Sequence, residues 1–179
     1  MEFSEVQRHV GGIPYINPRN AAKLYDFIVG NENISDVLEL GFAHGTASCY
    51  IAAALEERGG TLTSVDLIEA EDMFKPSIED LLAKTGLSPL VTIKREKTGY
   101  NWFLHNEIKA STTGNTCTPQ YDLCIIDGPK NWTIDGAAFF MVDKLLKKDG
   151  WLIFDDYGWS YASAAKQGSD STDGIAHRS

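Results

Sequence analysis

Apolar residues along the chain fall into two alternating patterns, and the alternation predicts strands and helices in turn. Short runs rich in Val, Ile and Leu are typical of buried strands, whereas longer stretches repeat their apolar residues with helical spacing. The predicted strands cover residues 36–40, 61–67, 90–93, 122–126 and 151–154. The predicted helices cover about 19–29, 46–58, 76–85, 100–109 and 136–146. We therefore expect a Rossmann-like, doubly wound α/β fold with a mainly parallel sheet and helices on both faces.

Polar segments divide the chain further. The expected organisation is an N-terminal helical segment at 1–33, a core at 34–161 and a polar tail at 162–179. Residues 111–120, rich in Thr and Gly, are predicted to form a surface loop. Lys147, Lys148 and Gly150 suit the C-terminal end of the last predicted helix, because basic residues and glycine favour helix ends.

Composition narrows the classes of partner. The formal net charge of -9 argues against a protein that holds a phosphate backbone by general attraction, so a small molecule is favoured over nucleic acid. Cys49, Cys117 and Cys124 form no CxxC pair and are expected to be reduced. The chain has neither a signal-peptide start nor an apolar run long enough to span a bilayer, so we expect a cytoplasmic protein without a membrane partner.

A glycine-bearing turn follows the first predicted strand. Gly41 and Gly45 in the run Glu39–Thr46 allow a tight turn that opens into a helix, although any doubly wound fold can contain such a turn. Asp66 ends the second strand roughly 20 residues beyond, a spacing that suits a carboxylate accepting the ribose hydroxyls of an adenosine ligand. A nicotinamide-dependent enzyme is less well matched, because Ala43 replaces the middle glycine of its motif. The carboxylate of Glu39 would also repel a pyrophosphate, whereas it would attract a cationic ligand.

Carboxylates follow the fourth and fifth predicted strands. Asp127, Asp155 and Asp156 are expected at one rim of the sheet, where they would repel one another unless a cation or a donor lies between them. Mg²⁺ prefers such oxygen ligands, whereas helix capping or solvation is the alternative role for one or two of the three. Lys130 is a candidate general base if its pKa is lowered, and a solvated loop lysine otherwise.

These residues resemble a known family. The run 37–45 looks like the first motif of class I S-adenosylmethionine-dependent methyltransferases, particularly the catechol O-methyltransferase type. Asp127 and Lys130 match that group's metal aspartate and catalytic lysine in spacing. The run 154–158 resembles both that group's metal-ligand pair and a motif of the macrocin O-methyltransferase type. The resemblance extends over about 34–161.

The resemblance implies methylation of a hydroxyl on a small molecule, with S-adenosylmethionine as the cofactor and Mg²⁺ or another divalent cation assisting. The implied cofactor-binding residues are Glu39, Gly41, Phe42, Gly45, Thr46, Asp66, Leu67 and Asp127. The implied metal ligands are Asp127, Asp155 and Asp156, and the implied catalytic residues are Lys130, which would remove the hydroxyl proton, and Asp127.

The sequence also departs from the family. The family has an acidic or small polar residue after the third strand that binds adenine, but residues 94–100 contain no obvious Gly-Asp match, and Thr98 and Gly99 are the nearest candidates. The family's sheet continues after its fifth strand with a helix and an antiparallel pair, which the 18 residues after Tyr161 are too short to supply. Either the sequence is a fragment, or a partner chain completes the edge as a homo-oligomer. Residues 11–18 could close over the cofactor's methionine end, or simply lead into a helix packed on the sheet.

Three alternatives stay open at this point. The first is a cofactor-binding or regulatory domain without catalysis, and the second is a nicotinamide-dependent oxidoreductase. The third is aminopropyl transfer, which the Asp127–Lys130 spacing makes less favourable than methyl transfer. His44 and His105 are weaker site candidates, because either could be a packing residue.

Overall fold

A five-stranded parallel sheet forms the centre of the molecule. The computed structural model describes residues 1–155 and residue 160. Within them the strand order is β3–β2–β1–β6–β7, and every neighbouring pair is parallel. The strands are β1 (Asp36–Leu40), β2 (Thr61–Leu67), β3 (Val91–Glu96), β6 (Tyr121–Ile126) and β7 (Leu146–Phe154). The predicted Rossmann-like α/β fold is confirmed.

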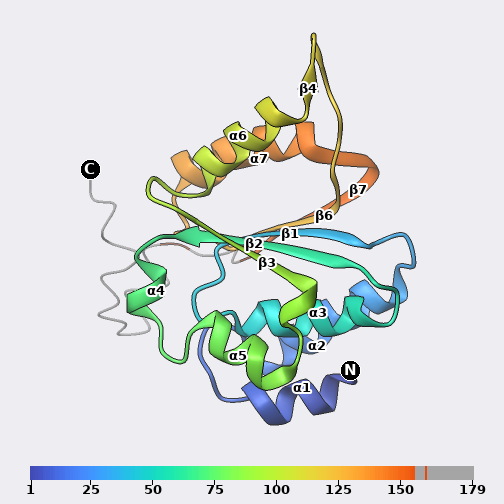
Figure 1. Cartoon of the computed structure of the whole chain (residues 1–179), viewed down its shortest axis with the longest axis vertical. Helices are drawn as coiled ribbons and strands as arrows, with labels where there is room; N and C mark the ends of the chain where they lie inside the picture. The colour runs from blue at the N-terminus through green and yellow to red at the C-terminus, as the bar shows by residue number, and fades with distance from the viewer. Residues whose placement is uncertain (156–159, 161–179) are drawn as a thin grey trace.

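Helices cover both faces of this sheet. They are α1 (Phe3–Val10), α2 (Pro18–Gly30), α3 (Thr46–Glu56), α4 (Ala70–Met73), α5 (Ile78–Thr85), α6 (Tyr100–Ala110) and α7 (Trp132–Leu145), with a 3-10 turn η1 at Ser88–Leu90. Figure 1 shows α1, α2, α3 and α5 on one face and α6 with α7 on the other. Successive residues of β1 serve the two sides: Val37 packs with the α2–α3 layer, and Leu38 and Leu40 pack with the α6–α7 layer.

The chain reverses its direction of travel across the sheet at β1. It moves outward from β1 through β2 to β3, and then returns to place β6 on the other side of β1. Helices leading from these strands therefore lie on opposite faces, which opens a crevice at the carboxyl ends of β1 and β6. This edge carries the residues that the sequence marks as candidates for the site.

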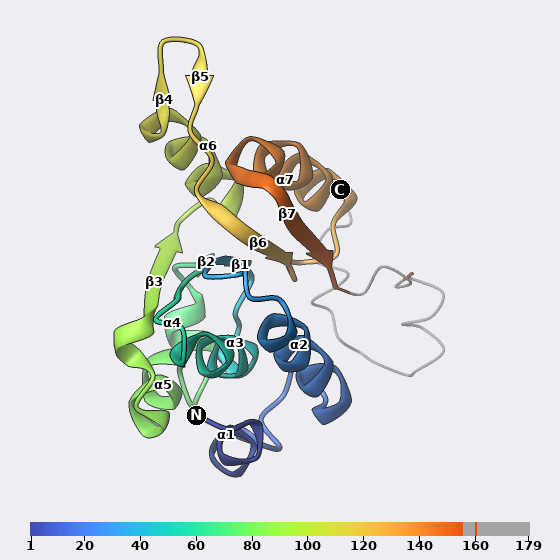
Figure 2. The ribbon, with the colours of Figure 1, turned by 90° about the vertical axis from the view of Figure 1, so that its right-hand side faces the viewer.

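The predicted loop at 111–120 is wrong in part. Residues Thr112–Thr113 (β4) and Thr116–Cys117 (β5) pair as a short antiparallel hairpin that projects away from the sheet (Figure 2). Gly114 at its tip has a φ of 61°, a left-handed value that a two-residue hairpin turn requires. The Gly114–Asn115 pair is a recognised turn signal, although the strands are too short to be seen from apolar alternation.

The last helix and strand both begin earlier than predicted. Helix α7 begins at Trp132, because the side chain of Asn131 caps it by accepting from the amides of Thr133 (2.9 Å) and Ile134 (3.3 Å). Strand β7 begins at Leu146, directly after the helix. Lys147, Lys148 and Gly150 therefore do not form a helix cap. They lie within β7 where its pairing with β6 is irregular.

The far edge of the described sheet is β7. Trp151 and Phe154 on this strand are partly exposed, and β6 is its neighbour in the sheet. Association of two copies through this edge stays a prediction. No helix in the described part of the chain is both long and apolar enough to cross a membrane.

Asp122 links three strands at their amino-terminal ends, on the side of the sheet away from the crevice. Its Oδ2 accepts from the backbone amide (3.1 Å) and hydroxyl (3.1 Å) of Ser35 and from the amide of Asp36 (2.8 Å). Lys147 on β7 lies 3.1 Å from Asp122 Oδ1 and 2.6 Å from Asp36 Oδ2. Burial alone would raise the pKa of Asp122, but the two amides and the Lys147 ammonium together lower it below its ordinary value.

We expect Asp122→Ala to lower the free energy of unfolding by about 2–3 kcal/mol at pH 7, because two amides and an ammonium lose a charged acceptor. A lowered folded-state pKa contributes stability above the unfolded-state value, so the difference from wild type should shrink as the pH falls below about 4. Urea unfolding at pH 7 and at a pH below about 4 measures this difference. Asp143→Ala is the control, because Asp143 is exposed and pairs with its neighbour Lys144; an equal loss in both variants would contradict the expected anchoring role.

Candidate active site

The turn between β1 and α3 needs glycine at two positions. Gly41 has a φ of 94°, and a Cβ there would overlap the carbonyl of Asp127. Gly45 has a φ of 81°, and a Cβ there would lie 2.6 Å from Cβ of Ile78 on α5. Both glycines are thus required by backbone conformation and by close approach. The turn leads straight into Thr46, the first residue of α3, and presents a helix N-terminus at the crevice.

Asp66 lies beside this turn at the end of β2. Its Oδ2 accepts from the amides of Phe42 (2.9 Å) and Ala43 (2.8 Å), and its Oδ1 accepts from the amide of Leu67 (2.7 Å). The structure therefore brings Asp66 and the glycine turn together, as their spacing predicts. A carboxylate has about four lone-pair positions, so these three bonds leave capacity for a ligand hydroxyl.

Glu39 is buried under the turn, with 1% of its surface exposed. Its Oε2 accepts from the hydroxyls of Ser48 on α3 (2.5 Å) and Ser64 on β2 (2.7 Å). Burial raises the pKa of Glu39 to about 7, although the two serine hydroxyls oppose the shift, and Asp127 and Asp66 add to it. The carboxyl group is therefore poised to respond to a positive charge placed nearby. The two serines were not identified from the sequence; the register that pairs Glu39 with Ser64 is the signal that could have identified one of them.

The ends of β6 and β7 bring an acid–base group together. Lys130 Nζ donates to Oδ1 of Asp127 and lies 3.8 Å from Oδ2 of Asp155. The pKa of Asp127 is raised to about 6. Burial is the main cause and the nearby Asp155 adds to it, whereas the Lys130 ammonium opposes the shift. Lys130 has a φ of 58°, a left-handed value. Asp156, the third expected metal ligand, lies outside the described residues.

A partly buried pair that the sequence did not reveal supports the Asp127–Lys130 loop. Tyr100, the first residue of α6, donates its hydroxyl to Oδ1 of Asp135 on α7. A Cβ on Gly128 would overlap the Tyr100 hydroxyl, so the backbone of the loop lies directly on this pair. Asn101 adds a second link, from its Nδ2 to the carbonyl of Ile134 (3.1 Å). The loop is therefore supported where α6 and α7 begin.

Two of the expected cofactor residues do not present their side chains openly. The Phe42 side chain is 4% exposed and packs in the core, with the guanidinium of Arg95 5.6 Å from its ring. The Thr46 hydroxyl donates to the carbonyl of Pro14 (3.3 Å).

Leu67 is 43% exposed at the end of β2, and a Cβ on Gly99 would be 3.7 Å from its Cδ2. His44 bonds through Nδ1 to the carbonyl of Pro76 (2.8 Å).

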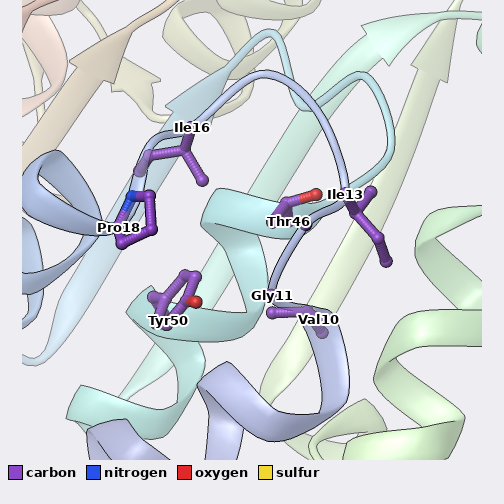
Figure 3. A pocket seen from close by; sticks show the side chains of 8 residues that line it. Val10, Gly11, Ile13, Ile16, Pro18, Thr46 and Tyr50 are labelled. Carbon is purple, nitrogen blue, oxygen red and sulfur yellow. The ribbon is translucent and has the colours of Figure 1, made fainter.

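A cavity of about 230 Å³ lies between the start of α3 and the segment 11–17 (Figure 3). Its apolar lining comes from Val10, Ile13, Ile16 and Pro18, and α3 contributes Thr46 and Tyr50. It contains none of the carboxylates described above. The segment 11–17 thus passes beside the N-terminus of α3, and its closure over the methionine end of a cofactor stays a prediction.

From pH 5 to pH 8 we expect the free energy of unfolding of the wild type to fall by about 2–3 kcal/mol relative to that of Glu39→Gln. A folded-state pKa raised from 4.5 to about 7 means that the unfolded chain ionises first, so the wild type loses stability across this window and the amide does not. Urea unfolding at the two pH values measures the difference. Glu57→Gln, at an exposed position after α3, is the control; equal pH dependence in wild type and Glu39→Gln would refute the assignment.

Solved structures with this fold include three transferases. The O-methyltransferase TomG from Streptomyces achromogenes, solved with S-adenosylmethionine, is 16% identical with a TM-score of 0.64, covering 97% of this chain and 71% of TomG. An O-methyltransferase from Bacillus cereus in complex with S-adenosylhomocysteine is 17% identical with a TM-score of 0.58, covering 81% of this chain and 61% of that one. The S-adenosylhomocysteine-bound methyltransferase PaMTH1 from Podospora anserina is 12% identical with a TM-score of 0.63, covering 85% and 60%.

These TM-scores show a shared fold, and a match to a family model shows the family. No curated protein sequence matches the chain. A model described as a methyltransferase domain matches residues 38–157, which include the glycine turn, Asp66, and the ends of β6 and β7. The resemblance to class I methyltransferases is thereby confirmed, and the chain belongs to the methyltransferase domain family.

Proposed function

We propose that this protein transfers a methyl group from S-adenosylmethionine to a hydroxyl group of a small molecule. One observation carries the proposal. The glycine turn with Asp66 lies at the same sheet edge as the Asp127–Lys130 pair, so a cofactor site adjoins an acid–base group. The structures of TomG with S-adenosylmethionine and of PaMTH1 with S-adenosylhomocysteine, which share the fold, support the choice of ligand.

Each part of the cofactor finds suitable chemistry along this edge. The free carboxylate capacity of Asp66 suits the ribose hydroxyls, and the exposed apolar surface of Leu67 suits the adenine. The N-terminus of α3 suits the methionine carboxylate. Glu39, Asp66 and Asp127 provide a negative environment for the sulfonium and ammonium charges.

The chemistry asks little of the protein beyond orientation and one proton transfer. When bound, S-adenosylmethionine would supply a methyl group on its sulfonium, which the acceptor oxygen would take in line while the sulfur becomes a neutral thioether. Lys130 accepts the hydroxyl proton once its ammonium has lost a proton to solvent; a sulfonium nearby would favour the neutral amine, whereas Asp127 and Asp155 favour the ammonium. Asp127 holds Lys130 in place through the bond to Nζ.

A divalent cation is part of the proposal as far as the donor set supports it. Asp127 and Asp155 are oxygen donors of the kind that Mg²⁺ prefers, and they end neighbouring strands. Lys130 already compensates part of their charge, and no group of three His, Cys, Asp or Glu gathers within residues 1–155. When bound there, a cation would lower the pKa of a coordinated hydroxyl.

The alternatives predict other properties. A nicotinamide-dependent oxidoreductase is not favoured, because the matching family is that of methyltransferases. A domain without catalysis would bind cofactor but transfer no methyl group to any acceptor. The Asp127–Lys130 pair at the cofactor edge supports the enzyme over the inactive domain.

We expect S-adenosylhomocysteine to bind with micromolar affinity and Gly41→Ala to weaken binding at least 30-fold, because the added methyl group forces the turn away from Asp127. Isothermal titration calorimetry measures both. Gly114→Ala is a matched control: its φ is also left-handed, but a Cβ there meets nothing within 4 Å. A wild-type chain that is folded and does not bind the ligand would refute the proposed cofactor.

We expect Mn²⁺, used as a paramagnetic substitute for Mg²⁺, to bind the wild type and to be lost from Asp127→Asn. Lys130→Met should bind it more tightly, because the carboxylates then lose their competing ammonium. Electron paramagnetic resonance of free and bound Mn²⁺ checks this without a methyl acceptor. Asp143→Asn is the control for non-specific carboxylate binding, because Asp143 is exposed near the C-terminal end of α7. If wild type and Asp127→Asn bind Mn²⁺ equally, or neither binds it, the proposed metal site is wrong.

A further inference from the structure

The turn that receives the cofactor has a conformation that needs outside support. Gly41, Ala43 and Gly45 have φ values of 94°, 47° and 81°. Glycine adopts such values freely, but they are unfavourable for a residue with a Cβ. Ala43 is therefore strained, and some interaction must hold the turn in place.

Asp66 supplies that interaction. Its Oδ2 accepts from the amides of both Phe42 and Ala43, the two residues at the centre of the turn, at 2.9 and 2.8 Å. Hydrogen bonds to an ionised acceptor are the stronger kind, worth roughly twice those between neutral groups. The bond from Leu67 to Oδ1 fixes the carboxylate in the orientation that these two amides require.

One carboxylate can serve the turn and a ligand at once. Three of its lone-pair positions are used within the protein, and the two oxygens retain capacity for a further donor. The ribose contact proposed above therefore adds to the bonds from the turn without replacing them. The same side chain then connects the conformation of β1's turn to the occupation of the ribose site.

We propose that Asp66 is a positioning residue as well as a ribose ligand: its carboxylate sets the conformation of the glycine turn and so controls binding of cofactor parts that Asp66 never touches. The inference rests on the proposed function, because it concerns the same cofactor site. Without the carboxylate, the turn samples other conformations, and every ligand that needs the native turn binds more weakly in proportion to the lost population.

The test compares two ligands that differ only at the ribose. S-adenosylhomocysteine can donate a ribose hydroxyl to the remaining lone-pair position of Asp66, whereas its 2′,3′-dideoxy analogue has no hydroxyl to donate. We expect Asp66→Ala to weaken the first ligand about 100-fold and the dideoxy analogue still about 10-fold, because the second loss reflects the turn alone. Calorimetric titration of wild type and variant with each ligand gives the four affinities.

Two further variants separate positioning from general damage. Asp66→Asn keeps one oxygen that can accept from Phe42 and Ala43, so its loss for the dideoxy analogue should be smaller than that of Asp66→Ala. Asp122→Ala removes a carboxylate that also accepts backbone amides, but at the opposite edge of the sheet, and it should leave both affinities unchanged. Hydrogen exchange at the amides of Phe42 and Ala43 should quicken in Asp66→Ala and not in Asp122→Ala.

The outcomes distinguish the two proposals. If Asp66→Ala weakens S-adenosylhomocysteine but leaves the dideoxy analogue unaffected, Asp66 acts through the ribose alone and the positioning role is overturned. If amide exchange at Phe42 and Ala43 does not change, it is overturned as well. If the folded wild type binds neither ligand, the cofactor assignment itself fails.

Discussion

The contact between the backbones of Gly41 and Asp127 is the constraint on which the site depends. These residues follow the central strand β1 and its neighbour β6, at the point where the chain reverses its direction across the sheet. No side chain fits between them, since even a Cβ on Gly41 would overlap the carbonyl of Asp127. The glycine turn and the Asp127–Lys130 loop are consequently in direct contact.

Carboxylates crowd this edge, and the protein stabilises each by different means. Glu39 is buried and bonds to two serine hydroxyls, Asp66 bonds to backbone amides, and Asp127 bonds to the Lys130 ammonium. The three solutions leave different amounts of negative charge available. Of these three carboxylates, Asp127 alone pairs with a positively charged side chain. The region around Glu39 and Asp66 therefore still attracts a cation.

The sequence predicted the frame of this arrangement better than its details. The five strands and the positions of Gly41, Gly45, Asp66, Asp127 and Lys130 follow from apolar periodicity and from motif spacing. The supporting contacts do not, because they join residues that are distant in the sequence.

Tyr100 and Asp135 illustrate this, since nothing local relates them. Asn131 was a missed signal of another kind: its capping side chain starts α7 four residues before the apolar pattern becomes helical. The start of β7 was missed because Lys147 and Lys148 conceal a strand whose pairing is irregular.

The support of Gly128 by Tyr100 and Asp135 has a consequence for how such a site can change. The two residues belong to helices that also enclose the core on one face of the sheet, so the position of the Asp127–Lys130 loop is coupled to the packing of α6 on α7. A substitution deep between those helices would shift the loop without altering any residue at the crevice. Divergence among related chains in the molecules they accept can therefore arise from the interior of the protein, with the surface of the site left intact.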